Sequence, residues 1–159
     1  TPPLRLRGGW GGLRQSIDIL IANREEVTQL TGVAIDQTTE LLRALSNFAP
    51  VALMTDGSKG AYAIVSNTEC PAGHSVLRAY AYHIPSGGAK PKNLTGAGDA
   101  FGSGFLTGWI KSNGDIKEAL GVGTLNADSV VQHVGAKIGI LKKYPSFNQL
   151  KQLPILDLK

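Results

Sequence analysis

Apolar residues occur along the chain in short runs that alternate with longer, helix-like patterns. The runs over residues 17–22, 51–55, 61–65 and 76–84 are continuous or alternate with polar positions, as is typical of β-strands. The turn at residues 57–60, which contains two glycines, separates the second run from the third. We expect these strands to form one sheet.

Helical patterns lie between and after these strands. We expect a short helix over residues 24–30 that ends at Gly32, because glycine readily adopts the left-handed conformation that closes a helix. Thr38 is the predicted N-cap of the next helix, which ends before Pro50. The apolar face of that helix consists of Leu41, Leu42, Leu45 and Phe48.

Two longer helices are predicted in the second half of the chain. Residues 97–111 combine a stripe of small residues with a stripe of aromatic ones, which predicts a helix that is buried nearly all round. These stripes are Ala100, Gly104, Gly108 and Phe101, Phe105, Trp109. Asp115 and Glu118 have the spacing of a capping box for a further helix that runs to about His133. Strands that alternate with helices predict a layered α/β domain.

Length and composition narrow the class of protein. The 159 residues are 42% apolar, which is enough for one domain core. Residues 1–16 have no hydrophobic period, so we interpret them as a linker or a remnant of truncation, and residues 17–159 as the domain. The net charge of +4 comes from scattered lysines and arginines rather than a basic run, so no nucleic-acid partner is predicted. The lone Cys70 excludes an internal disulfide, which favours a reducing, cytoplasmic setting.

Neither a membrane span nor a histidine metal site is predicted. The most apolar stretch, residues 97–110, is shorter than the roughly 20 residues that span a bilayer and carries Asp99. We find no pattern of a signal peptide. The three histidines, His74, His83 and His133, lack the spacing of metal ligands. The oligomeric state stays open, with a homodimer as one candidate.

Residues 93–101, which have the sequence NLTGAGDAF, couple a glycine turn to the start of an apolar helix. Gly96 and Gly98 permit close approaches that a Cβ atom would forbid, so several N–H groups can converge on one anion. The helix that follows adds unpaired N–H groups and the positive end of its dipole. Asp99 either orients an attacking hydroxyl or stabilises the helix start, an effect worth about 0.3–1 kcal/mol.

These residues carry a resemblance to a known family. Residues 95–101 match the second signature of the ribokinase-like, or PfkB-type, carbohydrate kinases throughout, and the resemblance runs from about residue 17 to about residue 141. Residues 23–32 resemble the family's Asn-x-x-Glu element, and residues 55–60 resemble its nucleotide-binding strand-turn. The resemblance implies a ribokinase-like α/β fold that transfers a phosphoryl group from ATP, with Mg²⁺, to a hydroxyl of a sugar or nucleoside.

The resemblance also assigns roles in the glycine turn. It implies that Asp99 is the catalytic base or the group that orients the hydroxyl. Gly96, Ala97 and Gly98 would donate N–H groups to the transferred phosphoryl group, where charge develops during the reaction.

Further roles come from the two upstream elements. Asn23 would lie near the phosphates, and Glu26 would hold Mg²⁺ through water; the alternative is an N-cap and a solvated carboxylate. The residues expected to contact the nucleotide, which must also form the turn between two strands, are Thr55, Gly57, Ser58 and Gly60. Either Thr124 or Asn126 would contact the adenine, but not both, because they lie about 200° apart on a helix.

Two departures from the family pattern limit these expectations. Many members have Asp at the position of Asn93, and its carboxylate helps to hold a monovalent cation. The amide of Asn93 can coordinate K⁺ but lacks the negative charge. K⁺ binding by this chain therefore stays open. The family's N-terminal half, with its sugar-contacting residues and β-lid, has no counterpart before Ile17. We therefore expect a truncated ribokinase-like domain that acts as a sugar or nucleoside kinase. The alternatives are a noncatalytic module that binds a nucleotide or a partner, and a kinase of vitamin precursors.

Overall fold

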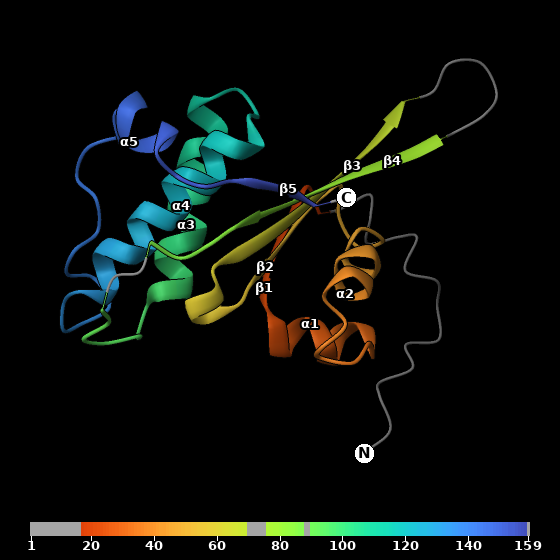
Figure 1. The fold of residues 1–159 in the computed structure, drawn as a ribbon, viewed down its shortest axis with the longest axis horizontal. Coiled ribbons are helices and arrows are strands. Elements are labelled where there is room, and N and C mark those ends of the chain that lie inside the picture. The colour runs from red at the N-terminus through yellow and green to blue at the C-terminus, as the bar shows by residue number, and fades with distance from the viewer. Residues whose placement is uncertain (1–16, 70–75, 88–89, 159) are drawn as a thin grey trace. The chain divides into compact units, whose positions relative to one another are not determined.

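The computed structural model describes residues 17–69, 76–87 and 90–158. They form an α/β fold with a five-stranded sheet of order β1-β2-β3-β4-β5 (Figure 1). The strands are β1 (Ile19–Asn23), β2 (Val51–Thr55), β3 (Ala61–Glu69), β4 (Val76–Ile84) and β5 (Leu156–Leu158). The helices are α1 (Arg24–Thr31), α2 (Thr38–Leu45), α3 (Ala97–Lys111), α4 (Ile116–Val131) and α5 (Phe147–Lys151), with a 3-10 turn at Gly57–Lys59.

The chain divides into two compact units. The first contains β1, α1, α2, β2 and most of β3 and β4. The second contains the 3-10 turn and helices α3, α4 and α5. The predicted strands and the four longer helices are confirmed, and β3 runs four residues beyond its predicted end.

Strands β1 and β2 of the first unit form a parallel pair connected through α1 and α2. Their register places Ile19 opposite Val51 and Asn23 opposite Thr55. Because the strands are parallel, their carboxyl ends meet at one edge of the sheet. Asn23 and Thr55, predicted from separate motifs, therefore lie side by side at that edge.

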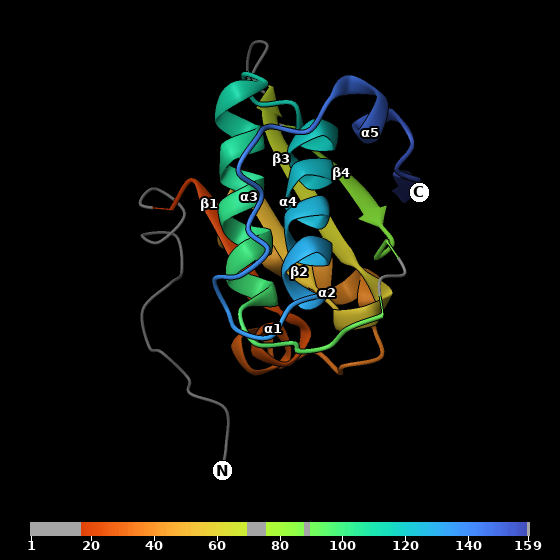
Figure 2. The same ribbon diagram turned by 90° about the vertical axis from the view of Figure 1, so that its left-hand side faces the viewer.

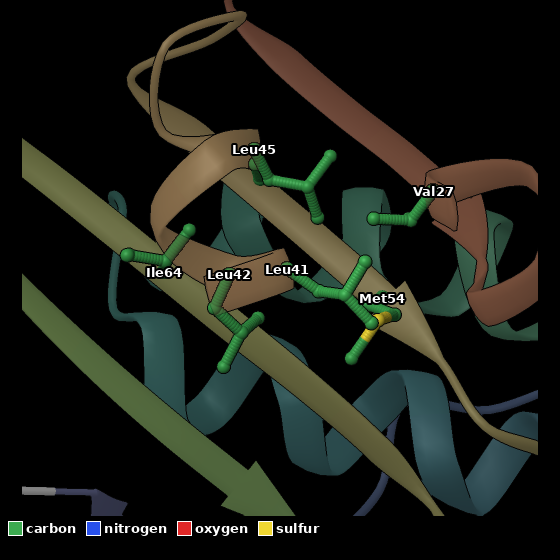
Figure 3. Packing of buried hydrophobic residues seen from close by; sticks show 7 residues of the cluster. Val27, Leu41, Leu42, Leu45, Met54 and Ile64 are labelled. Atoms are coloured by element: carbon green, nitrogen blue, oxygen red, sulfur yellow. The ribbon is translucent and has the colours of Figure 1, made fainter. Parts of the chain in front are cut away.

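The core of the first unit lies between α1, α2 and the strands (Figure 3). Three residues of the predicted apolar face of α2 are confirmed: Leu41, Leu42 and Leu45 are buried against Val27, Met54 and Ile64. Phe48 is also buried but follows the helix, which ends at Leu45. Full burial of such side chains is worth about 1.5–3 kcal/mol each. This face therefore holds α2 against the sheet.

The prediction that Thr38 caps α2 is wrong, because its side chain has another partner. Gln37 is the N-cap, and Thr38 begins the helix. The Thr38 hydroxyl accepts a hydrogen bond from Nη2 of Arg24 at 3.1 Å. Arg24 is buried, donates from Nη1 to the Ile35 carbonyl at 2.8 Å and forms an ion pair with Asp56 at 2.9 Å. It thus ties the start of α1 to the α1–α2 connection and to the end of β2.

Helices α3 and α4 of the second unit pack closely side by side (Figure 2). A Cβ atom added to Gly108 would lie 2.7 Å from the Cα of Ala119, so only glycine permits this approach. The prediction that α3 is buried nearly all round is wrong. Ser103, Leu106 and Thr107 are exposed, whereas the small residues Gly104 and Gly108 lie against α4.

Asp115 is the N-cap of α4, as predicted, but the predicted capping box with Glu118 does not form. Oδ1 of Asp115 accepts hydrogen bonds from the backbone of Lys117 at 2.8 Å and of Glu118 at 3.1 Å. The carboxylate of Glu118 accepts a hydrogen bond from the Tyr144 hydroxyl at 2.6 Å instead of closing the predicted capping box. The helix ends at Val131, two residues before the predicted end.

Candidate functional site

The glycine turn at residues 93–99 forms the start of α3. Gly96 is the N-cap and has a φ of 83°, in the left-handed region that favours glycine. A Cβ atom at this position would lie 2.7 Å from the side chain of Ala136 and 2.9 Å from its backbone. The fold itself therefore requires glycine at position 96.

Gly98, by contrast, faces open space. A Cβ atom there would meet no protein atom within 4 Å, and Gly98 and the neighbouring Asp99 are both exposed. Helical geometry leaves the first N–H groups of α3 without acceptors inside the helix, and no side chain caps this end. The Ala97 N–H does have an acceptor, the Leu94 carbonyl at 3.2 Å, which differs from its predicted use. The open side of the turn thus presents the Gly98 backbone next to the Asp99 carboxylate.

The loop before the turn is held against the end of α4. The backbone N–H groups of Lys92 and Asn93 donate to the Val131 carbonyl at 2.7 and 3.2 Å. The side-chain oxygen of Asn93 accepts a hydrogen bond from the Thr95 N–H at 2.8 Å. The amide of Asn93 therefore shapes the turn, and its use by a cation stays a prediction.

In the first unit, Asn23 and Glu26 form a complete capping box at the start of α1. The Asn23 side chain accepts from the Glu26 N–H, and Oε2 of Glu26 accepts from the Asn23 N–H, both at 2.8 Å. The N-cap alternative is therefore present in the structure. Both side chains are exposed at the carboxyl edge of β1 and β2, beside Thr55, so a second role toward a ligand remains open to them.

The predicted nucleotide turn is anchored through its carbonyl groups. The Ser58 carbonyl accepts from the Ser86 hydroxyl at 2.7 Å, and the Lys59 carbonyl lies 2.9 Å from Nε2 of His83. Gly57 and Gly60 both have positive φ, and a Cβ atom on Gly60 would clash with the end of β4. The turn is therefore held in place while the side chain of Ser58 stays exposed.

The two candidates for adenine contact are both buried, at 4% exposure each. The Asn126 amide donates to the Ala100 carbonyl at 2.7 Å and accepts from the Leu141 N–H at 2.9 Å. The structure thus gives Asn126 a role in joining α3, α4 and the segment after α4. A contact of Thr124 or Asn126 with adenine stays a prediction.

The structure brings the predicted residues together in two groups. In the first unit the parallel strands place Asn23, Glu26 and Thr55 at one edge. In the second unit, Gly96, Gly98 and Asp99 share the start of α3. Sequence reasoning missed the buried Arg24, because a lone arginine among acidic residues gives no signal of burial.

The described residues include no group of three or more His, Cys, Asp or Glu side chains placed to hold a metal ion. Among the same residues, no helix combines the length and apolar character that crossing a membrane requires.

Comparison with known proteins identifies the family. Residues 12–143 match the model of the pfkB family carbohydrate kinases. A comparison with curated protein sequences gives no significant match. Similar solved structures include a probable sugar kinase from Rhizobium etli CFN 42, at 25% identity and a TM-score of 0.64, covering 81% of this chain and 35% of that one.

Two further structures extend this comparison. The adenosine kinase from Sinorhizobium meliloti is 26% identical with a TM-score of 0.58, covering 80% of this chain and 35% of that one. The fructokinase from Vibrio cholerae O395, crystallised with fructose, ADP and calcium, is 25% identical with a TM-score of 0.57, covering 84% and 40%. The chain thus spans less than half the length of these structures. Because a family model matches most of its residues, the chain belongs to the pfkB family of carbohydrate kinases.

Proposed function

We propose that this chain is the nucleotide-binding and catalytic portion of an ATP-dependent kinase that phosphorylates a hydroxyl of a sugar or nucleoside. The observation that carries the proposal is the open side of the glycine turn. There the Gly98 backbone has no protein neighbour where its side chain would be, and the Asp99 carboxylate stands exposed in the first turn of α3. Relatives named as sugar, adenosine and fructose kinases support this substrate class.

In the proposed reaction, the acceptor hydroxyl attacks the γ-phosphorus of ATP. The bond from that phosphorus to the ADP oxygen breaks, and the hydroxyl proton passes to the Asp99 carboxylate. The Gly98 N–H and the N-terminus of α3 stabilise the charge that develops on the phosphoryl oxygens. Gly96 contributes indirectly, because its left-handed conformation aims the start of the helix.

The carboxylates of this chain fit Mg²⁺, which supplies neutralising charge on the ATP phosphates when bound. Mg²⁺ prefers oxygen ligands, keeps several waters and commonly takes only one or two carboxylates besides substrate phosphates. Glu26 is exposed, and only its Oε2 is used in the capping box, so Oε1 can accept from a metal-bound water. The lack of a three-carboxylate group among the described residues is compatible with such a site.

We extend the proposal to residues of each unit taken by itself, at the edge of β1 and β2 in the first unit and in the 3-10 turn of the second. Asn23 and Thr55 would orient the phosphates, and Gly57, Ser58 and Gly60 would contact the nucleotide. The buried ion pair between Arg24 and Asp56 would position both ends of this edge, because Arg24 follows Asn23 and Asp56 follows Thr55.

An ATP-consumption assay with a panel of pentoses, hexoses and nucleosides tests this function. We expect the 159-residue chain alone to bind ATP with little acceptor-dependent turnover, because water competes where nothing closes over the acceptor. In a protein that also supplies the N-terminal half of its relatives, Asp99→Asn should lower turnover by about 10²–10⁴-fold. ATP affinity should be unchanged, since the amide keeps the shape of the helix start.

Asp36→Asn, which removes an exposed carboxylate of the first unit, is the matched control and should leave turnover unchanged. Turnover that does not depend on Asp99 would remove the catalytic assignment. ATP binding without turnover in the complemented protein would favour a noncatalytic nucleotide-binding module.

A further inference from the structure

A cavity of about 310 Å³ lies in the second unit, on the outer side of α3 and α4. The segment 140–145 forms its third wall. This segment follows α4 in the chain and runs along α3 and α4 (Figure 2). A volume of this order is at the small end of the range for small-molecule sites. Neither the glycine turn nor the edge of β1 and β2 contributes to its lining.

The side of the cavity formed by α3 carries two hydroxyl groups and one lysine. Ser103, Thr107 and Lys111 follow at intervals of four residues, so they share one face of the helix. Thr107 donates its hydroxyl hydrogen to the Ser103 carbonyl at 2.8 Å, and Ser103 donates to the Ala100 carbonyl at 3.1 Å. The Ser103 hydroxyl oxygen also accepts from Nδ2 of Asn126 at 3.4 Å, so one of its lone pairs and both of those on the Thr107 hydroxyl are left for donor groups of a ligand.

The charge of the cavity is one-sided. Lys111, Lys142 and Lys143 line it, and its lining contains no carboxylate. Outside the lining, Oε1 of the Glu118 carboxylate accepts a hydrogen bond from the hydroxyl of Tyr144. Three lysines on one small volume favour a ligand group with more than one negative charge, and Nζ of Lys111 lies 4.9 Å from the centroid of the Tyr144 ring, which also lines the cavity.

The walls are fixed without a ligand. The buried Asn126 amide bonds both α3, through the Ala100 carbonyl, and the segment after α4, through the Leu141 N–H. The Tyr144 hydroxyl bonds Glu118 on α4. Such cross-links keep the cavity open and lower the ordering cost of binding.

We propose that this cavity is a second binding site that takes a small phosphorylated polyol, such as a sugar monophosphate. The phosphate lies among the three lysines, and hydroxyl groups of the ligand donate to the oxygens of Ser103 and Thr107. The site is separate from Asp99, because Thr107 lies eight residues further along α3, about 12 Å at the rise of an α-helix. The inference does not depend on the proposed kinase activity, since it concerns binding alone.

Calorimetric and NMR titrations of the 159-residue chain test this site, with ribose 5-phosphate, inorganic phosphate and ribose as probes. At a salt concentration of about 0.15 M, where weak surface attraction is screened, ribose 5-phosphate should bind saturably at 1:1. Lys142→Gln with Lys143→Gln should weaken this binding at least tenfold. The matched pair Lys137→Gln with Lys151→Gln, which removes the same charge from exposed positions outside the cavity, should change it less than twofold.

The polyol part of the proposal is tested separately. Ribose 5-phosphate should bind more tightly than inorganic phosphate, and Thr107→Val should reduce that difference. Equal affinities for the two probes would overturn the assignment of Ser103 and Thr107. The site as a whole is refuted if neither phosphate compound saturates, if both lysine pairs weaken binding equally, or if the amide shifts centre on Gly98 instead of Thr107 and Leu141.

Discussion

The two glycines at the start of α3 should respond in opposite ways to the same substitution. Gly96 has positive φ and no room for a Cβ atom, whereas Gly98 has a helical conformation and open space around it. Gly96→Ala and Gly98→Ala each add one methyl group, and the two positions are only two residues apart. The comparison therefore separates a glycine that the fold needs from one that only a ligand would need.

The structure gives the expected magnitudes. In Gly96→Ala, the left-handed conformation costs about 1–2 kcal/mol for a residue with a Cβ atom. Crowding against Ala136, at 2.7 Å, adds about 1–3 kcal/mol, so the free energy of unfolding should fall by about 2–5 kcal/mol. In Gly98→Ala, the higher helix propensity of alanine should leave that free energy unchanged or raise it by up to about 1 kcal/mol.

Urea unfolding followed by circular dichroism measures the two stabilities, and calorimetry measures ATP affinity. If phosphate approaches the Gly98 backbone, Gly98→Ala should weaken ATP binding at least tenfold, or about 1.4 kcal/mol, while the protein stays folded. Gly98→Val should weaken it further. The reasoning is refuted if both alanine variants lose stability equally, and the anion site is refuted if Gly98→Ala binds ATP as the unmodified chain does.

Two further predictions concern charges inside the fold. Arg24→Met should lower the free energy of unfolding by about 3–5 kcal/mol, because it removes the cation that pairs with the largely buried Asp56 carboxylate. Arg43→Met, which breaks an exposed ion pair, should cost less than about 1 kcal/mol, and equal losses in urea unfolding would contradict this. Burial raises the pKa of Asp128 above 3.8, although the hydrogen bond from Gly87 lowers it. Because the folded state then holds the proton more tightly, this stabilising contribution is present at low pH and lost as pH rises through the folded pKa. The test compares the unfolding free energies of the unmodified chain and of Asp128→Asn. Their difference, unmodified minus variant, should fall as pH rises above about 4, and a rise would refute the raised pKa of Asp128.

Local features of the sequence determined most of the elements and the position of the glycine turn. Apolar periodicity predicted β1 to β4 and the extent of α3, because burial of one face is a local pattern of side chains, but it did not predict the short elements α5 and β5. The left-handed conformations of Gly32 and Gly96 follow from the freedom that a missing Cβ atom allows. The motif over residues 95–101 is local as well, because the residues with proposed catalytic roles lie within one turn of chain. The family could therefore be identified from the sequence.

The tertiary structure decided which polar side chains are already occupied. Thr38 accepts from Arg24 instead of capping α2, and Glu118 accepts from Tyr144 instead of closing a capping box. Asn126 joins three segments of the second unit. Each of these partners lies more than ten residues away in the sequence, and a hydrogen bond of that range depends on the packing of whole elements.

The lysines that line the cavity of the second unit were also brought together by packing that the sequence does not reveal. Lys111 belongs to α3, whereas Lys142 and Lys143 follow α4 about 30 residues later. In the sequence they are three scattered charges, which predict a solvated surface. They line one cavity only because α3 and α4 pack closely and the Asn126 amide holds the following segment across them. The sequence therefore determined the elements and the catalytic motif, and long-range packing decided which of their side chains meet.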